Sequence, residues 1–229
     1  MKKQNLIYLA AFAMLGFTAC TDAPESDEAK TSEAKEVTTA EGAAYKVDPA
    51  GSKIEWIGTK VTGFHHGELS VKSGELDVKD TAITGGSFII DMTSLKVVDK
   101  GDTATNNKLQ GHLVSPDFFD VAKNPEAKFE ITSVKPFTGS VTDSADVRQE
   151  GISQYKVANP THLISGNLTL KGVTKNVEFP AKVTISGTGV DAIAKFNIDR
   201  KQWNIVYPGK PNDLIRDNVH LGIALKATK

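Results

Sequence analysis

The only cysteine of the chain, Cys20, has a setting that is typical of a lipid attachment site. It follows an apolar run of 12 residues, 6–17, which comes after the positively charged start at residues 1–3. A membrane-spanning helix needs about 20 apolar residues, so this run is typical of a secretory signal peptide. The small residues just before Cys20 resemble the site that lipoprotein signal peptidase cleaves. We therefore expect residues 1–19 to be a signal peptide and Cys20 to carry diacylglycerol and a further acyl chain such as palmitate.

Two acyl chains hold a protein at a membrane stably. The prediction is therefore an envelope protein anchored by lipid, at the outer membrane, on its periplasmic face or at the cell surface. The alternative is a plain secreted protein that is cleaved near Ala19, with Cys20 incidental. A single cysteine also excludes an intramolecular disulfide and a zinc site built from thiolates.

Histidine is the other residue type that could carry chemistry, but its pattern does not indicate a site. His65 and His66 are adjacent on an expected strand or turn, so we expect their side chains to point apart, which is poor for one metal. His112 and His162 could meet in space, and His220 stands alone. The motifs of serine hydrolases, P-loop proteins, dinucleotide-binding proteins and zinc proteases are all absent from the sequence. We expect no enzyme activity, no metal and no cofactor.

The charge balance excludes some partners. The formal net charge is −1, and there is no basic stripe or arginine run, so nucleic acid is not an expected partner. The sequence leaves the oligomeric state open, monomer or homodimer.

Residues 20–44 have the composition of a linker. After Cys20 the segment is made mainly of Ala, Thr, Ser, Glu, Asp and Lys, with seven acidic residues and two lysines and no apolar periodicity. Such a segment cannot bury enough apolar surface to offset the entropy of ordering it. We expect a disordered acidic tether. Residues 26–28 resemble a surface-export signal of Bacteroidota lipoproteins, the alternative being a solvated linker.

Residues 45–229 show the pattern of an antiparallel β domain. Apolar residues alternate with polar ones in at least eight short runs, and Gly-containing turns separate these runs. One wet and one dry face per strand indicate an all-β domain, either a closed barrel or a sandwich, and closure would remove the exposed edges. One short helix is expected over residues 102–113, with a further turn that starts at Ser115. Residues 138–159 are polar and are expected to form a long loop.

Three segments carry a resemblance to a known family. They are residues 109–129, with His112-Leu-x-Ser-Pro-Asp-Phe-Phe-Asp; residues 165–175, with Gly-Asn-Leu-Thr-Leu-Lys-Gly-Val-Thr-Lys; and residues 198–205, with Ile-Asp-Arg-Lys-Gln-Trp-Asn-Ile. With the start at residues 45–56, they resemble the YceI-like, polyisoprenoid-binding family from residue 45 to about residue 226. The chain departs from the family pattern at Asn204, where many members have Gly, and in its longer 138–159 loop.

The resemblance implies a lipocalin-like antiparallel barrel of about eight strands with one or two short helices. It also implies an elongated apolar pocket for a long apolar lipid, a polyisoprenoid or similar amphiphile, held for carriage or storage. The alternative is a structural or stress-related envelope protein whose barrel is filled by its own side chains. The expected headgroup contacts are Arg200 and Lys201, although the pair Asp199-Arg200 is more typical of a structural ion pair or turn than of a headgroup site. By strand parity, the expected pocket lining is Ile54, Trp56, Leu69, Val71, Phe88, Ile90, Phe129, Ile131, Leu168, Leu170, Phe196 and Ile198.

Overall fold

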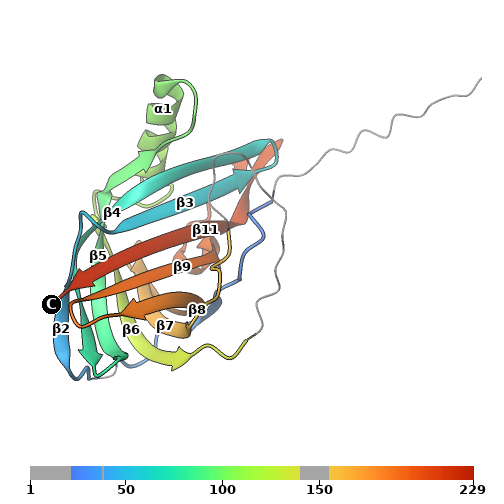
Figure 1. Cartoon of the computed structure of the whole chain (residues 1–229). Coiled ribbons are helices and arrows are strands. Elements are labelled where there is room, and N and C mark those ends of the chain that lie inside the picture. The colour runs from blue at the N-terminus through green and yellow to red at the C-terminus, as the bar shows by residue number, and fades with distance from the viewer. Residues whose placement is uncertain (1–21, 38, 140–154) are drawn as a thin grey trace, which may run out of the picture.

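The computed structural model describes residues 22–37, 39–139 and 155–229, which form a closed antiparallel barrel (Figure 1). Cys20, the predicted signal peptide and most of the predicted 138–159 loop lie outside the described residues. The elements are β1 (Lys30–Glu33), β2 (Ala43–Val47), β3 (Lys53–Lys60), β4 (Gly63–Lys79), β5 (Ala82–Val97), α1 (Thr103–Leu113), β6 (Glu126–Pro136), β7 (His162–Leu170), β8 (Val173–Ile185), β9 (Gly189–Asp199), the 3₁₀ helix η1 (Arg200–Trp203), β10 (Gly209–Lys210) and β11 (Asp213–Thr228).

The barrel has eight strand positions, as the alternation of apolar residues indicates. The hydrogen-bonded order is β3, β4, β5, β6, β7, β8, β9, β11 and back to β3. β2 shares the position of β3, because it pairs with the far ends of β4 and β11. The break between them is a tight turn in which Asp48 Oδ1 accepts the Ala50 N–H at 3.0 Å, next to Pro49, which has no N–H to donate. The predicted fold class is confirmed: an all-β barrel with one α helix and one 3₁₀ helix.

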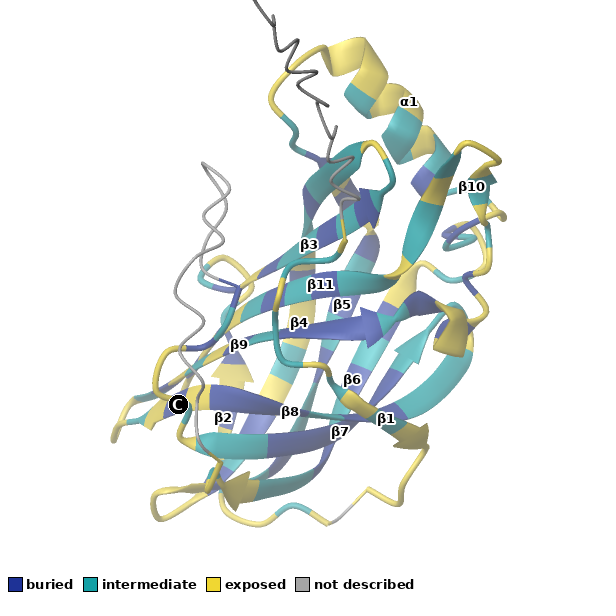
Figure 2. Ribbon diagram, turned by 90° about the vertical axis from the view of Figure 1, so that its right-hand side faces the viewer, coloured by how far each residue is buried: buried dark blue, intermediate teal, exposed yellow. Residues whose placement is uncertain are grey.

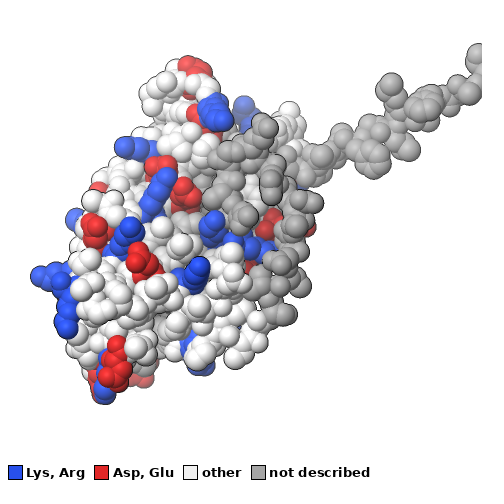
Figure 3. Space-filling view, viewed as in Figure 1, with Lys and Arg blue, Asp and Glu red and all other residues white. Residues whose placement is uncertain are grey.

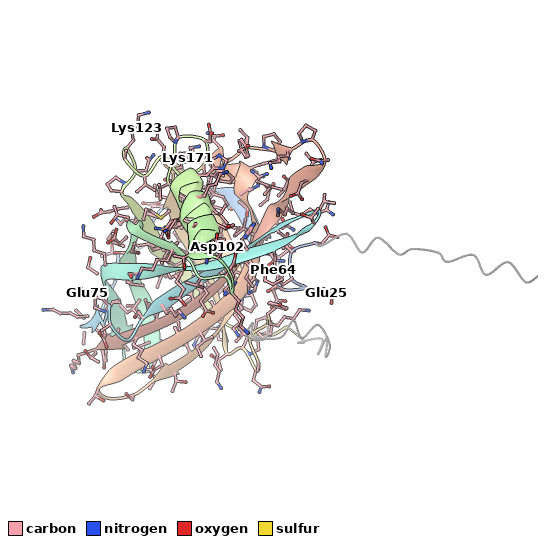
Figure 4. All side chains as sticks on the ribbon, turned by 90° about the horizontal axis from the view of Figure 1, so that it is seen from above. Glu25, Phe64, Glu75, Asp102, Lys123 and Lys171 are labelled. Carbon is pink, nitrogen blue, oxygen red and sulfur yellow. The ribbon has the colours of Figure 1, made fainter. Side chains whose placement is uncertain are left out.

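The two ends of the barrel differ. The connections β3–β4, β5–β6, β7–β8 and β9–β11 lie at one end, which we call the open end, and α1 belongs to the β5–β6 connection there (Figures 1 and 4). Asp102 caps α1 by accepting the N–H groups of Ala104 and Thr105, which gives the predicted helix its start. The turn predicted at Ser115 is present, since the Ser115 carbonyl accepts the N–H of Phe118 and that of Asp120. The β4–β5 and β8–β9 turns lie at the opposite, closed end.

The core lies inside the barrel, where the apolar side chains of all eight positions meet (Figure 2). Near the closed end it is filled by side chains such as Leu76, Val78, Phe179 and Val183, each less than a tenth exposed. Within the described ranges, neither helical element has the length and apolarity to cross a membrane. On the face seen in Figure 3, basic and acidic residues are interspersed, as the balanced charge of the sequence suggests.

The prediction of a disordered tether is wrong for residues 22–37. This segment, which we call the N-terminal strap, runs along the outside of the barrel. β1 within it pairs antiparallel with β8 from Lys30↔Glu178 to Glu33↔Lys175. Just before β1, the Ala29 N–H donates to the Asn197 carbonyl of β9 at 2.9 Å.

The strap fills a gap in the wall. β8 and β9 pair with each other only between residues 181–185 and 190–194, so their other halves have free edges. Residues 27–29 bond to the edge of β9, and β1 bonds to the edge of β8. The fold therefore includes residues that precede the expected domain boundary at residue 45.

Polar side chains on the outer faces of β6, β7 and β8 explain how a segment with few apolar residues can dock. Asn176 is fully buried, and its side chain bonds to Ser165, Thr132 and Asn167 at 2.8–3.1 Å. Asn167 in turn accepts the Lys35 N–H at 3.0 Å and donates to the Lys35 carbonyl at 2.7 Å. Buried amides need such partners, and the strap backbone supplies them. The strap is held by hydrogen bonds, which leave no periodic signal in its sequence.

Candidate functional site

A cavity of about 340 Å³ lies inside the barrel towards the open end. All eight strand positions contribute to its wall, together with α1 and the connections at the open end. The wall is predominantly apolar, with polar groups gathered at the open end. The lining residues are Ile54, Trp56, Gly58, Thr59, Lys60, His65, Leu69, Phe88, Ile90, Met92, Leu95, Leu109, His112, Leu113, Phe118, Phe119, Ala127, Phe129, Leu168, Leu170, Val177, Phe196, Ile198, Arg200, Ile205, Tyr207, Gly209, Lys210, Asp213, Ile215, Val219, Leu221 and Ile223.

The structure places ten of the twelve expected lining residues on the cavity wall. The two exceptions, Val71 and Ile131, are buried in the core but do not reach the cavity. Each lies beside a register shift, in β4 between Val71 and Ser73 and in β6 between Ile131 and Ser133. Both side chains point into the barrel, as parity predicts, but each lies farther from the open end than a lining residue of its own strand, Leu69 or Phe129, and is covered by other core side chains. The ten on the wall are Ile54, Trp56, Leu69, Phe88, Ile90, Phe129, Leu168, Leu170, Phe196 and Ile198.

The part of the barrel towards the open end is not filled by its own side chains. Trp56 and Leu69 point inwards, yet they are only partly buried because they face the cavity rather than other side chains. The same holds for Val219, Leu221 and Ile223 of β11, whose shared parity was visible in the sequence although they were not assigned to the pocket. The interior therefore offers apolar surface that a guest molecule could cover.

Aromatic rings form the floor of the cavity. Phe88 and Phe129 approach to 5.4 Å between ring centroids, and Phe129 contacts Phe179 at 5.8 Å. Phe179 stacks on Phe196 at 4.0 Å, nearly parallel. Gly166 makes room for this floor, because a Cβ there would lie 2.2 Å from Cζ of Phe129. The rings separate the cavity from the filled closed end.

Polar groups are confined to the open end. Lys60 Nζ lies 2.7 Å from Asp213 Oδ2, and the hydroxyl of Thr62 donates to the other carboxylate oxygen at 2.9 Å. The hydrogen bond from Lys60 lowers the pKa of Asp213 below its ordinary value, and those from Thr62 act in the same direction. Lys60 and Asp213 therefore line the open end of the cavity as an ion pair.

A cluster of three rings closes part of the same end. His112 of α1 meets Phe118 edge-on at 5.0 Å and Tyr207 edge-on at 4.7 Å, and Phe118 and Tyr207 are 5.3 Å apart. The segment that contains His112 and Phe118 is one of the three that carry the family resemblance in the sequence, but neither residue was expected at the site. The ring contacts join α1 and the turn that follows it to the β9–β11 connection.

The expected headgroup contacts are not arranged for that role. The Lys201 side chain is about half exposed, pairs with Asp217 at 2.7 Å and does not reach the cavity. Arg200 does line the cavity, but its guanidinium donates to the backbone carbonyls of Ile205, Ile215 and Arg216. Burial lowers the pKa of Arg200. Its donors fasten the β9–β11 connection to β11, so the structural interpretation of this residue fits better.

Nearby, Asp199 caps η1 by accepting the Lys201 N–H at 2.9 Å, which is the predicted turn. Asn204 ends η1 in the left-handed conformation, at φ 56°. This explains the departure from the family pattern, since asparagine tolerates a backbone conformation for which glycine is the usual choice.

The histidines are not where parity placed them. His65 and His66 were expected to point apart, but both contact Asp99. Their Nδ1 atoms lie 2.6 and 2.8 Å from its two carboxylate oxygens. Asp99 can reach both because it follows the end of β5, at the strand edge. His112 lies at the open end, whereas His162 begins β7 at the closed end, so these two do not meet. In the described ranges, no three His, Cys, Asp or Glu residues are grouped to hold a metal ion.

Two cavity residues have buried polar atoms without a partner among the described residues. These are the indole nitrogen of Trp56 and the hydroxyl oxygen of Thr59. Buried polar atoms in native proteins nearly always have a hydrogen-bond partner. The wall thus keeps some hydrogen-bonding capacity next to its large apolar surface.

Fold and site together define an antiparallel barrel with an apolar cavity that is closed at one end and polar at the other. The model of the YceI-like domain matches residues 45–227, and the chain belongs to this family.

Curated relatives include a UPF0312 protein of Pseudomonas putida strain W619, which is 32% identical over 152 residues. The match covers 65% of this chain and 65% of that protein. A UPF0312 protein of Pseudomonas aeruginosa strain LESB58 is also 32% identical, over 63% of this chain and 64% of its own length. The chain thus spans just under two thirds of the length of these relatives.

Solved structures share the fold. BcnA of Burkholderia cenocepacia aligns with a TM-score of 0.53 at 21% identity, over 80% of this chain and 99% of that one. A polyisoprenoid binding domain from Saccharophagus degradans, described as implicated in plant cell wall breakdown, aligns with a TM-score of 0.55 at 14% identity, over 80% and 97%.

Proposed function

We propose that the chain is a lipid-anchored envelope protein whose barrel holds one long apolar lipid, a polyisoprenoid or similar amphiphile, for carriage or storage. The observation that carries the proposal is the cavity of about 340 Å³ with its apolar wall and aromatic floor. This volume lies within the range of about 300–1,000 Å³ that is usual for ligand sites. The polyisoprenoid-binding domain that shares the fold supports the choice of lipid class.

The energetics of an apolar guest are favourable without any specific polar contact. Each CH₂ group that is moved from water into such a wall gains about 0.8 kcal/mol, so ten groups gain about 8 kcal/mol. Losses of freedom on binding remove a large part of this gain. Micromolar binding remains within reach, since it requires about 8 kcal/mol net and a prenyl chain offers more than ten such groups.

The open end would receive the polar head of the guest. Lys60, Asp213, His112 and Tyr207 take this place in the proposal instead of Arg200 and Lys201. A polar head would meet them while the chain lies on the apolar wall below.

We infer a binding protein and not an enzyme. A catalyst acting on a lipid would need acidic or basic groups beside the buried chain. The lower wall and the floor around Phe88, Phe129 and Phe196 offer none, and the charged groups of the cavity lie at its polar end.

Native mass spectrometry of the purified protein tests the ligand. After incubation with a prenyl quinone, and separately with a straight-chain fatty acid, we expect a one-to-one complex with at least one of them. Lipid extraction of protein taken directly from cells should yield a long-chain apolar compound. A mass of the protein alone after both incubations, together with an extract that contains no long-chain compound, would contradict the carrier function and favour a structural role.

A matched pair of tryptophan variants tests the cavity itself. Leu221→Trp places a large ring on the cavity wall, whereas Ile193→Trp places the same ring on an outward-facing position of β9 that is 44% exposed. We expect the first variant to lose at least tenfold in lipid affinity and the second to bind like the parent protein. Equal affinities would show that lipid binds elsewhere.

The anchor is tested separately. The full chain and its Cys20→Ser variant are expressed in a bacterial host, and the membrane and soluble fractions are compared. We expect the parent protein in the membrane fraction with added acyl mass at residue 20, and the variant in the soluble fraction. A parent protein without added mass would contradict lipidation.

A further inference from the structure

The N-terminal strap ties the start of the described chain to the open end of the barrel. Asp22, its first residue, pairs with Arg216 at 2.9 Å. Arg216 lies near the beginning of β11, and its backbone carbonyl accepts the Nε–H of Arg200, which lines the cavity. Farther along the strap, the side chain of Asn197 donates to the Pro24 carbonyl at 2.9 Å and so fastens the segment to β9.

This attachment leaves little distance between Cys20 and the barrel. Consecutive Cα atoms are about 3.8 Å apart, so the Cα of Cys20 lies within about 7.6 Å of that of Asp22. A flexible tether over residues 21–44, as the sequence predicts, would give a typical reach of about 27 Å. The strap therefore changes the geometry of an anchored protein: the open end is held near the anchor.

The surface at this end suits a lipid bilayer. Four large apolar side chains of the described residues are exposed, and two of them lie at the open end. Val206 belongs to the β9–β11 connection, and Leu214 is the second residue of β11. The turns at the closed end within the described ranges, residues 80–81 and 186–188, carry none of the four. Apolar side chains beside a polar rim are typical of surfaces that touch a membrane.

The charges at the open end also favour contact with a lipid surface. Its carboxylates are largely engaged within the protein: Asp102 and Asp199 cap helices, and Asp120 pairs with Lys123 at 3.0 Å. By contrast, three exposed lysines of this end form no ion pair with the described residues. They are Lys100, Lys108 and Lys210. Figure 4 looks onto this end, where Asp102 and Lys123 come from the β5–β6 connection and Lys171 from the β7–β8 connection. Basic side chains are attracted to an anionic lipid surface.

We propose that the open end of the barrel rests on the membrane that holds residue 20, so that the cavity opens onto the lipid surface. The inference rests on one part of the proposed function, the anchor at Cys20, and does not require a lipid guest. A guest could then pass between bilayer and cavity without crossing water, because the strap fixes which end of the barrel faces the anchor.

The test uses full-length protein that has been lipidated in its bacterial host and purified from membranes. Intact mass at residue 20 is read first. The protein is then placed in vesicles of phosphatidylcholine and phosphatidylglycerol with brominated acyl chains, which quench tryptophan emission at short range. Val206→Trp reports the open end, Ile193→Trp reports the side of the barrel, and the parent protein supplies the background of Trp56 and Trp203.

We expect the added emission of Val206→Trp to be quenched at least twofold and that of Ile193→Trp to be unchanged. Ala29→Pro removes the bond from the strap to Asn197 and should abolish the difference. Glu36→Pro, at an exposed strap position outside β1, should preserve it. Equal quenching of the two reporters in acylated protein would overturn the inference alone. Absence of acyl mass would overturn the anchor and with it the inference, whereas failure to bind lipid in solution would overturn only the carrier function.

Discussion

Both faces of β7 and β8 are buried, but different chemistry buries each of them. The inner face presents Leu168 and Val177 to the cavity wall, where apolar contact alone suffices. The outer face presents Asn167 and Asn176, which are as well buried as the inner residues but satisfied by hydrogen bonds to one another and to the strap. The inner face therefore offers apolar contact without directional bonds, whereas the outer face fits one particular segment of the chain.

The largest expected effect is on the inner face. Phe196→Ala removes a ring that stacks on Phe179 at 4.0 Å and leaves a hole beneath the cavity. We expect the free energy of unfolding to fall by about 3–5 kcal/mol, as for other buried Phe to Ala changes. Urea unfolding followed by circular dichroism measures it. A loss below about 1 kcal/mol would mean that the aromatic floor is not closely packed.

A pH effect of similar size is expected on the outer face. His220 is buried beside Asn197, and burial, with a smaller contribution from Lys195, lowers its pKa to about 4. The unfolded chain binds this proton near pH 6.5, so the unfolded state gains protons first as the pH falls. Stability should therefore be full above pH 6.5 and decline towards pH 4, by up to about 3 kcal/mol.

Unfolding of the parent protein and of His220→Gln at pH 7, 5 and 4 isolates this contribution, because the other titrating groups are common to both proteins. The difference in unfolding free energy between the two should shrink as the pH is lowered. A constant difference would show that His220 is accessible to protons in the folded state.

A smaller loss is expected when the outer network is cut. Asn176→Ala leaves Thr132, Ser165 and Asn167 without one of their partners, at a cost of about 1–3 kcal/mol. Amide hydrogen exchange should rise within residues 30–35, which lie over this network. Unchanged exchange in the strap would separate the buried amides from the docking of the strap and so weaken the comparison of the two faces.

The smallest effect belongs to the exposed ion pair of Asp22 and Arg216. Asp22→Ala should cost less than about 1 kcal/mol, and less still at high salt. Thermal unfolding at low and at high ionic strength provides the measurement. A loss of several kcal/mol would mean that this pair, and not the backbone bonds of β1, holds the strap.

Much of the fold could be predicted from the sequence because an apolar interior leaves a period of two along each strand. Trp56, Leu168 and Ile198 were placed on the cavity wall in this way. Val71 and Ile131 were placed on the correct face but not at the correct depth, because parity gives the side of a strand and not how far along the barrel the cavity extends.

The docking of the strap could not be predicted. Its contacts run through main-chain groups, which every residue has, and through buried amides that read as polar surface in the sequence, as at Asn167 and Asn176. For the same reason Arg200, which looks like a headgroup contact in the sequence, turns out to bind backbone carbonyls. Whether a polar side chain is buried depends on hydrogen-bond partners far away in the sequence, and the residue pattern of one strand holds no information about them.

The close fit of Gly166 under the ring of Phe129 has a consequence for the cavity. A side chain at this position would have to push the ring away from β7, and this ring lines the cavity. The depth of the cavity is therefore set by a residue that never touches it. A single methyl group at position 166 would therefore alter the dimensions of the cavity through the displaced ring.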